Sequence, residues 1–165
     1  MTQDFTTEPL YRPNVGAVLF NTEGHVLVAR RADLPRDVAE RTGWQLPQGG
    51  IDPGESPREA VLREVLEEIG TDRVEILAEH EEWLTYEFPP HVRIGGPKQR
   101  FRGQRQRWFA LRLLGTDAEI RLDAHAPPEF DAWRWVDLAA LPALAVDWKR
   151  PVYEALVRAF SRFAC

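Results

Sequence analysis

A helix with well-marked ends in the middle of the chain is the feature that most constrains its fold. Ser56-Pro57-Arg58-Glu59 has the pattern of a capping box with proline at the first helical position. Gly70 predicts the end, because glycine readily takes the left-handed conformation that closes many helices. Between these signals apolar residues recur at helical spacing and predict one buried face: Val61, Leu62, Val65, Leu66 and Ile69.

An acidic cluster is expected on the opposite face of this helix. Glu64, Glu67 and Glu68 are related as i, i+3 and i+4, so their carboxylates project into one patch and repel one another. One interpretation is a solvated acidic face, the usual meaning of a charge run. The other is a divalent cation site, because Mg²⁺ and Mn²⁺ prefer hard oxygen ligands.

A longer pattern around the helix favours the cation site. It comprises Gly49, Glu55, Arg63-Glu64-Val65, Glu67-Glu68 and Gly70, and it resembles the Nudix box, the signature of the Nudix hydrolase superfamily. Only Thr71 departs from it, where the box calls for a bulky aliphatic residue. The resemblance implies an α/β/α sandwich with a mixed β-sheet between helices. It also implies hydrolysis of a phosphoanhydride with Mg²⁺ or Mn²⁺, with more than one ion bound.

The same resemblance implies roles for individual residues. Glu64, Glu67 and Glu68 are expected to act as metal ligands or general base, and the backbone carbonyl of Gly49 as a further ligand. A fourth carboxylate is expected from outside the box. Glu119 is the candidate, because it follows a turn after the strand that contains Trp108, and Asp117 and Asp123 are its rivals.

Two other charged residues of the box have a predicted supporting role. Glu55 is expected to fix the loop or the outer shell of the metal site. Arg63 is expected to pair with an acidic neighbour rather than with substrate.

Composition bounds the remaining possibilities. A chain of 165 residues with 44% hydrophobic content fits one globular domain, residues 1–165. The net charge of −5 argues against general electrostatic affinity for nucleic acid, although a local basic surface could supply it. The single Cys165 allows no intrachain disulfide. No membrane span or signal peptide is evident, so we expect a soluble, cytoplasmic monomer.

The other segments alternate between strand and loop signals. Strands are predicted at residues 15–20, 25–31, 74–77, 83–88, 105–114, 118–122 and 133–136, the first two forming a hairpin. The polar segment 32–43 predicts a loop with a helical turn at 36–41. A second helical turn is expected at 137–141, ending near Pro142, and an amphipathic helix at 151–160. Strands outnumber helices, which favours an α/β sandwich.

Segments outside the box indicate the substrate by resemblance. Five of them are similar to the RNA pyrophosphohydrolase group: residues 11–16 (YRPNVG), 44–50 (WQLPQGG), 104–109 (QRQRWF), 129–135 (EFDAWRW) and 146–151 (VDWKRP). Residues 83–90 (WLTYEFPP) resemble plant-type diadenosine tetraphosphate hydrolases. The first resemblance implies removal of pyrophosphate from 5′-triphosphorylated RNA, leaving a 5′-monophosphate. The second implies cleavage of diadenosine tetraphosphate to ATP and AMP.

The first resemblance also implies a substrate-binding set. Arg12 and Lys149 are expected to meet phosphates, Arg31, Val146 and Trp148 to contact the leading bases, and Gln48 to join them. Stacking of bases on aromatic or guanidinium planes, at about 1 to 3 kcal/mol each, agrees with these residue types. Trp148 could instead be an ordinary packing residue, and Arg12 could cap a sheet edge.

A basic loop ranks RNA above a dinucleotide. Residues 98–107 carry five cationic side chains and no acidic one: Lys98, Arg100, Arg102, Arg105 and Arg107. A solubilising loop is the alternative explanation.

The loop at 32–43 looks longer than in the enterobacterial type of RNA pyrophosphohydrolase, and Gly43 stands where that type has a small hydroxyl residue. The resemblance therefore does not imply a preference for particular bases. A non-catalytic nucleotide-binding module is disfavoured because every box carboxylate is present. A protein activator remains an open question.

Overall fold

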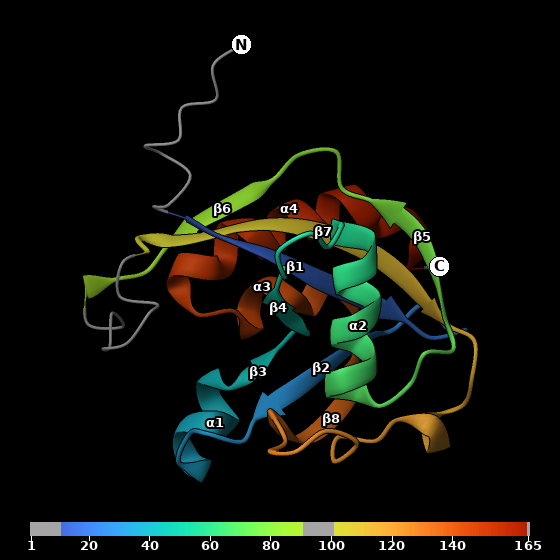
Figure 1. Ribbon diagram of the computed structural model, residues 1–165. Coiled ribbons are helices and arrows are strands. Elements are labelled where there is room, and N and C mark those ends of the chain that lie inside the picture. The colour runs from blue at the N-terminus through green and yellow to red at the C-terminus, as the bar shows by residue number, and fades with distance from the viewer. Residues whose placement is uncertain (1–10, 91–100, 165) are drawn as a thin grey trace.

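The computed structural model describes residues 11–90 and 101–164 and contains one mixed sheet of eight strands (Figure 1). The strands are β1 (Tyr11–Phe20), β2 (Val26–Arg31), β3 (Trp44–Gln45), β4 (Gln48–Gly50), β5 (Val74–Glu79), β6 (Leu84–Glu87), β7 (Gly103–Leu113) and β8 (Phe130–Val136). The α-helices are α1 (Arg36–Thr42), α2 (Pro57–Ile69), α3 (Leu141–Leu144) and α4 (Arg150–Phe160). Short 3₁₀ helices include η4 (Asp117–Glu119), η5 (Leu138–Ala140), η6 (Asp147–Lys149) and η7 (Ser161–Phe163).

Strands β1 and β7 form the parallel centre of the sheet. They pair from Tyr11 opposite Gly103 to Phe20 opposite Arg112, while the other strand pairs are antiparallel. The predicted β1–β2 hairpin is present, with Phe20 paired to Val26. The first half of β1 pairs with β4 instead, so β1 and β2 diverge. This divergence opens the sheet at the end where the site lies.

Side chains on the two faces of the sheet form two separate cores. On one face, Val18 and Phe20 of β1 pack with Leu156 and Phe160 of α4. On the other face, Leu19 belongs to a cluster that includes residues of α2. Alternation along each strand sends successive side chains to opposite faces, and each face buries its set under a helix. The α/β/α sandwich with a mixed sheet is therefore confirmed.

Helix α2 begins and ends as predicted. The Ser56 hydroxyl accepts from the Glu59 N–H at 3.2 Å, the Glu59 carboxylate accepts from the Ser56 N–H at 3.2 Å, and Gly70 has φ 83°. The predicted buried face is partly wrong, because Leu62 and Leu66 are 40% and 46% exposed. The buried residues are Ala60, Val61, Val65, Glu68 and Ile69. The stripe is rotated toward Glu68, so one carboxylate is buried at the edge of the core.

Two other local predictions differ from the structure. Residues 118–122 were expected to be extended, but Asp117–Glu119 form the 3₁₀ helix η4, capped by Thr116 and the Glu119 side chain. A capping box of four residues stabilises this turn locally, whereas none of the described strands pairs with the segment. Pro142 does not end a helical turn but lies in the first turn of α3, where its missing N–H has no cost.

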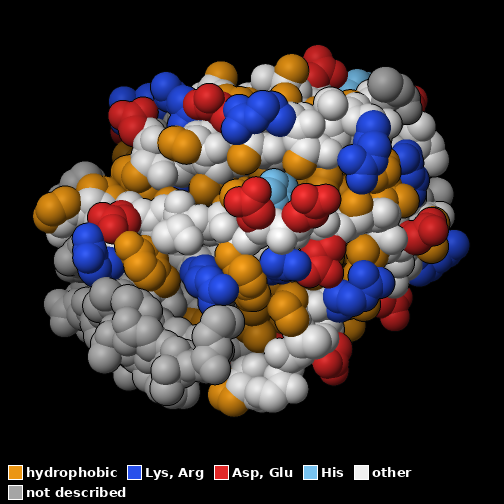
Figure 2. Space-filling view, turned by 90° about the horizontal axis from the view of Figure 1, so that it is seen from above, with side chains coloured by type: hydrophobic (Ala, Val, Ile, Leu, Met, Phe, Trp, Pro, Cys, Tyr) orange, Lys and Arg blue, Asp and Glu red, His pale blue; other side chains and the backbone are white. Residues whose placement is uncertain are grey.

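The surface of the described residues carries charges of both signs. Figure 2 shows Lys, Arg, Asp and Glu side chains interspersed on the face along the β5 and β6 edge. Lys98 and Arg100 of the predicted basic loop, and Cys165, lie outside the described residues. Within the described part of the chain, no helix combines the length and apolar character needed to cross a bilayer.

Candidate active site

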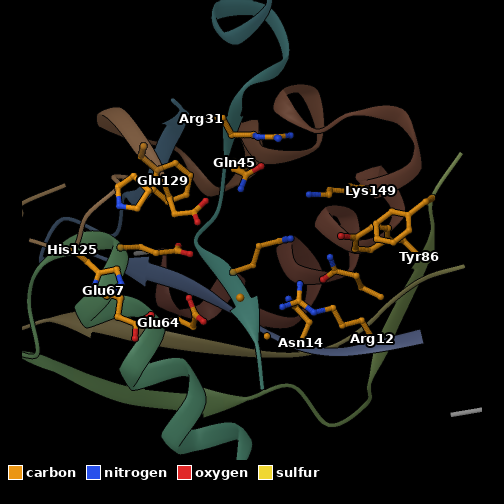
Figure 3. A pocket seen from close by; sticks show the side chains of 18 of the residues that line it. Arg12, Asn14, Arg31, Gln45, Glu64, Glu67, Tyr86, His125, Glu129 and Lys149 are labelled. Carbon is orange, nitrogen blue, oxygen red and sulfur yellow. The ribbon is translucent and has the colours of Figure 1, made fainter. Parts of the chain in front are cut away.

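A cavity of about 670 Å³ opens where β1 and β2 diverge. Acidic side chains line one side of it and basic side chains line the other. Figure 3 shows Glu64, Glu67 and Glu129 on one side and Arg12 and Lys149 on the opposite side. The cavity therefore has two ends of opposite charge.

Two adjacent glycines of β4 bring the two sides together. A Cβ atom added to Gly49 would lie 2.0 Å from Cδ of Glu64, and one added to Gly50 would lie 2.5 Å from a guanidinium nitrogen of Arg12. Both distances are far below normal van der Waals contact. The missing side chains at these positions therefore let a carboxyl group and a guanidinium group pack directly against the β4 backbone.

Burial strongly perturbs the carboxyl groups of α2. Glu68 is 8% exposed, and burial together with the neighbouring charge of Glu64 raises its pKa far above the usual range. Burial also raises the pKa of Glu64. The Oε2 atom of Glu68 is buried without a hydrogen-bond partner. Glu129 contributes to the raised pKa of Glu68 by its charge. Without a cation, these carboxyl groups are held in an unfavourable environment.

Arg63 connects the carboxylates of the box through hydrogen bonds. It donates to Glu55 at 2.8 Å, to Glu64 at 2.9 Å and to Glu67 at 3.3 Å, and it also donates to the carbonyl oxygen of Gly50 at 2.8 Å. The hydrogen bonds from Arg63 to Glu55, and then the bond from the Asp52 N–H, lower the pKa of Glu55 to about 2. The predicted pairing of Arg63 with acidic neighbours is confirmed. Glu55 also accepts from the Asp52 N–H at 3.0 Å and so fixes the loop before α2, as predicted.

The donor atoms at the acidic end fit a hard divalent cation. They are oxygen atoms, they are crowded, and one of them, Oε2 of Glu68, is buried and unpaired. Residues of the described part of the chain do not form a complete cage of three or more acidic, His or Cys side chains. Glu64 lies against the Gly49 peptide and next to Glu68 at this end.

The basic end combines a partly buried lysine with aromatic side chains. Burial, and then the nearby charge of Arg31, lower the pKa of Lys149 to about 8. The Lys149 ammonium lies 5.4 Å from the ring centre of Tyr86, within range of a cation–π interaction. Burial raises the pKa of Tyr86 to about 12, so its hydroxyl stays neutral. Trp148 lines the same end.

A hydrogen-bonded network forms the floor of the cavity. The buried Gln106 amide donates to Asn14 at 2.8 Å and to Gln48 at 3.1 Å, and it accepts from the indole N–H of Trp108 at 3.1 Å. This network fixes the side chain of Gln48. The neighbouring Gln104 lines the cavity, and its buried Oε1 atom has no partner. Gln104 is thus a polar group placed to meet a ligand.

Most of the predicted site residues are brought together in this cavity. Its lining includes Arg12, Arg31, Gln48, Gly49, Glu64, Glu67, Glu68, Trp148 and Lys149. Val146 and Glu119 do not line it. Glu119 instead accepts from the Thr116 N–H at 2.7 Å and from Arg73 at 3.0 Å, so its carboxylate is engaged at the end of η4.

Sequence reasoning missed several residues that line the cavity. They are Asn14, Tyr86, Gln104, His125 and Glu129. Tyr86 and Gln104 face each other across β6 and β7, a pairing that alternation along the predicted strands could have indicated. Glu129 is brought to the site because β8 pairs with β2 and the Ala32 N–H donates to the Glu129 carbonyl at 2.9 Å. No local signal marks that contact.

The three described arginines of the basic loop do not line the cavity. Arg102 donates to Glu87 at 3.0 Å, and Arg107 donates to Glu79 at 2.6 Å. The Arg105 guanidinium lies 4.3 Å from the ring centre of Trp83. None of these three arginines lines the cavity. On the surface, two of these arginines form ion pairs and the third stacks on a tryptophan ring. They contribute no side chain to the cavity.

Comparison with known proteins agrees with the geometry. The family model described as NUDIX domain matches residues 10–156. RNA pyrophosphohydrolase of Acidiphilium cryptum is 64% identical over 154 residues, covering 93% of this chain and 92% of the relative. RNA pyrophosphohydrolase of Rhodospirillum rubrum is 52% identical over 154 residues, covering 93% and 89%.

Solved structures share the fold at lower identity. The E. coli dihydroneopterin triphosphate pyrophosphohydrolase has a TM-score of 0.63 and 23% identity, covering 91% of this chain and 99% of that one. A C. elegans Ap4A hydrolase binary complex has a TM-score of 0.61 and 20% identity, covering 91% and 96%. The family match extends over most of the sequence and includes both sides of the cavity. The chain therefore belongs to the NUDIX family, in the group whose members are named RNA pyrophosphohydrolase.

Proposed function

We propose that this protein is a metal-dependent RNA pyrophosphohydrolase that removes pyrophosphate from the 5′-triphosphate end of RNA and leaves a 5′-monophosphate. The observation that carries the proposal is the cavity with carboxylates at one end and Arg12, Arg31 and Lys149 at the other. Such a cavity would let a phosphate chain extend from the acidic end, where a cation would be held, to the basic side chains. The names of the similar proteins support the same substrate.

The acidic end is proposed to hold Mg²⁺ or Mn²⁺ through Glu64, Glu67, Glu68 and the carbonyl oxygen of Gly49. We assign the fourth carboxylate to Glu129 rather than Glu119. Glu129 lines the cavity and acts on Glu68 through its charge, whereas Glu119 is bonded to Arg73 outside it. When bound, a divalent cation neutralises phosphate oxygens and lowers the pKa of a coordinated water.

The basic end is proposed to bind the phosphates that the cations do not reach. Arg12 presents a guanidinium held against Gly50, a geometry suited to phosphate oxygens. Lys149 has a pKa lowered to about 8, and an adjacent phosphate would favour its protonated form. The neutral Tyr86 hydroxyl and the amide of Gln104 supply further polar contacts along the path. Together they orient the phosphate chain.

The leading bases are proposed to lie between Arg31 and Trp148. Both residues line the basic end of the cavity, and both have planar groups that stack on unpaired bases. Val146, the residue immediately before η6, does not line the cavity. A single-stranded 5′ end is the substrate form that can present such bases.

A rate comparison tests the proposal. Purified protein with Mg²⁺ is assayed on a triphosphorylated RNA oligonucleotide, on diadenosine tetraphosphate and on ATP. We expect the RNA to be converted fastest, with release of pyrophosphate and a kcat/KM that falls steeply as salt concentration rises. Efficient formation of ATP and AMP from diadenosine tetraphosphate, with slow RNA turnover and mild salt dependence, would instead identify a dinucleoside polyphosphate hydrolase.

A pair of arginine variants controls for general charge effects. Arg12→Ala removes a cavity cation and should lower kcat/KM on triphosphorylated RNA by about 10-fold to 100-fold, the range for a lost charge-assisted hydrogen bond. Arg158→Ala removes an exposed charge from α4, outside the cavity, and should leave kcat/KM nearly unchanged. Equal effects of the two substitutions would contradict the assigned site.

A further inference from the structure

A two-point ion pair joins Arg31 and Asp33 at the edge of the cavity. The Arg31 Nε–H donates to Oδ1 of Asp33 at 2.9 Å, and an Nη2–H donates to Oδ2 at 2.6 Å. Each carboxylate oxygen therefore meets a separate nitrogen of the guanidinium. The side chains are 42% and 64% exposed, so the pair contributes little to folding stability. Its geometry, however, fixes the plane of the guanidinium.

The backbone at Arg31 and Ala32, just before Asp33, is anchored by hydrogen bonds to neighbouring segments. The Arg31 N–H donates to the Gly43 carbonyl at 3.0 Å, and the Ala32 N–H donates to the Glu129 carbonyl at 2.9 Å. Asp33 follows directly on this anchored turn. Its carboxylate is consequently held at a defined place relative to the cavity lining, although its side chain lies on the surface.

The charge of Arg31 also affects a second cationic side chain of the cavity, Lys149. It acts on the partly buried Lys149 and contributes to lowering its pKa. Figure 3 shows Arg31 and Lys149 on the same part of the wall. The Asp33 carboxylate offsets part of the Arg31 charge and leaves the flat faces of the guanidinium unoccupied by this interaction.

We propose that Asp33 is a positioning residue for substrate recognition: it holds the Arg31 guanidinium in the plane on which a leading base of the RNA stacks. This inference rests on the proposed function, because it assumes an RNA substrate. It predicts that the contribution of Asp33 depends both on Arg31 and on the presence of a base. Asp33 itself does not touch the reacting phosphates.

The test measures KM and kcat separately on two triphosphorylated oligonucleotides. One is a normal RNA, and the other lacks the bases at the second and third positions. Asp33→Ala should raise KM for the normal RNA by about 3-fold to 10-fold, a part of the stacking contribution, with a much smaller change in kcat. Asp33→Glu, which keeps the charge, should recover part of the loss. On the abasic RNA, Asp33→Ala and the wild type should have similar KM.

A double-mutant cycle and a matched control complete the test. In an Arg31→Ala background, Asp33→Ala should have no further effect on KM. Asp37→Ala removes a similar carboxylate that pairs with Arg41 on α1 at 4.0 Å and does not line the cavity, so KM should not change.

Two results separate failure of this inference from failure of the proposed function. A wild-type protein that does not hydrolyse triphosphorylated RNA would overturn the proposed function. An active wild type in which Asp33→Ala raises KM equally on abasic RNA, or equally without Arg31, would overturn the positioning role alone.

Discussion

Replacing Glu68 by Gln should stabilise the metal-free protein while abolishing its response to Mg²⁺. Glu68 is 8% exposed, and burial with the charge of Glu64 raises its pKa from 4.5 to about 10. Because the native state then binds a proton that the unfolded chain has lost, the free energy of unfolding falls as pH rises from about 4.5 toward about 10. Glutamine has the same shape, never ionises, and can still donate to Glu64.

The size of the effect follows from the pH interval. Each pH unit between the unfolded and the folded pKa costs about 1.4 kcal/mol. At pH 7 this interval is about 2.5 units, so Glu68→Gln should raise the free energy of unfolding by up to about 3 kcal/mol. For a chain of this length, that corresponds to roughly 6 to 12 °C in Tm. Near pH 4.5 the two proteins should be equally stable.

Thermal and urea unfolding with a chelator, at pH 4.5, 7 and 8.5, measures this difference. On adding Mg²⁺, the wild type should gain Tm because the ion binds only the native state, and the variant should not. Glu154→Gln, at an exposed position of α4, is the matched control and should leave both curves unchanged. A metal-free variant that is less stable than the wild type at pH 7, or a difference that does not vary with pH, would refute the reasoning.

Three further predictions concern the site and its supporting helix. Glu129→Gln should lower kcat on triphosphorylated RNA by at least about 100-fold, a loss expected for one strong transition-state interaction. Glu119→Gln should leave kcat within about threefold, because Glu119 pairs with Arg73 outside the cavity. The reverse order would restore the assignment to Glu119. Gly70→Ala places a Cβ atom on a residue with φ 83° and within 2.3 Å of the Arg121 carbonyl oxygen, so it should destabilise the protein by about 1 to 3 kcal/mol. Urea unfolding measures this loss, and an unchanged midpoint would contradict the prediction. Ser56→Ala removes the cap of α2 and should cost about 1 kcal/mol, measured in the same way, with Ser56→Thr close to the wild type.

Local sequence determined the segment that carries the chemistry. The bounds of α2 follow from Ser56, Glu59 and Gly70, whose hydrogen bonds and backbone conformation involve residues within a few positions. The Arg63 contacts within the box are also mostly local, since Glu64 and Glu67 lie on the same helix. Short-range interactions of this kind are visible in the sequence because their geometry is fixed by the helix period.

Only the tertiary structure decided which face of α2 is buried and which carboxylate completes the acidic end. Periodicity placed Leu62 and Leu66 in the core, but the sheet beneath α2 takes the stripe that includes Glu68, so a carboxyl group is buried and strained. Glu129 reaches the cavity through the pairing of β8 with β2, about a hundred positions earlier in the chain. A pairing at that separation has no local pattern, because it depends on how the whole sheet closes. The sequence by itself therefore determined the helix, its acidic residues and the family, whereas the folded sheet determined the cavity, its two charged ends and the residues that line them.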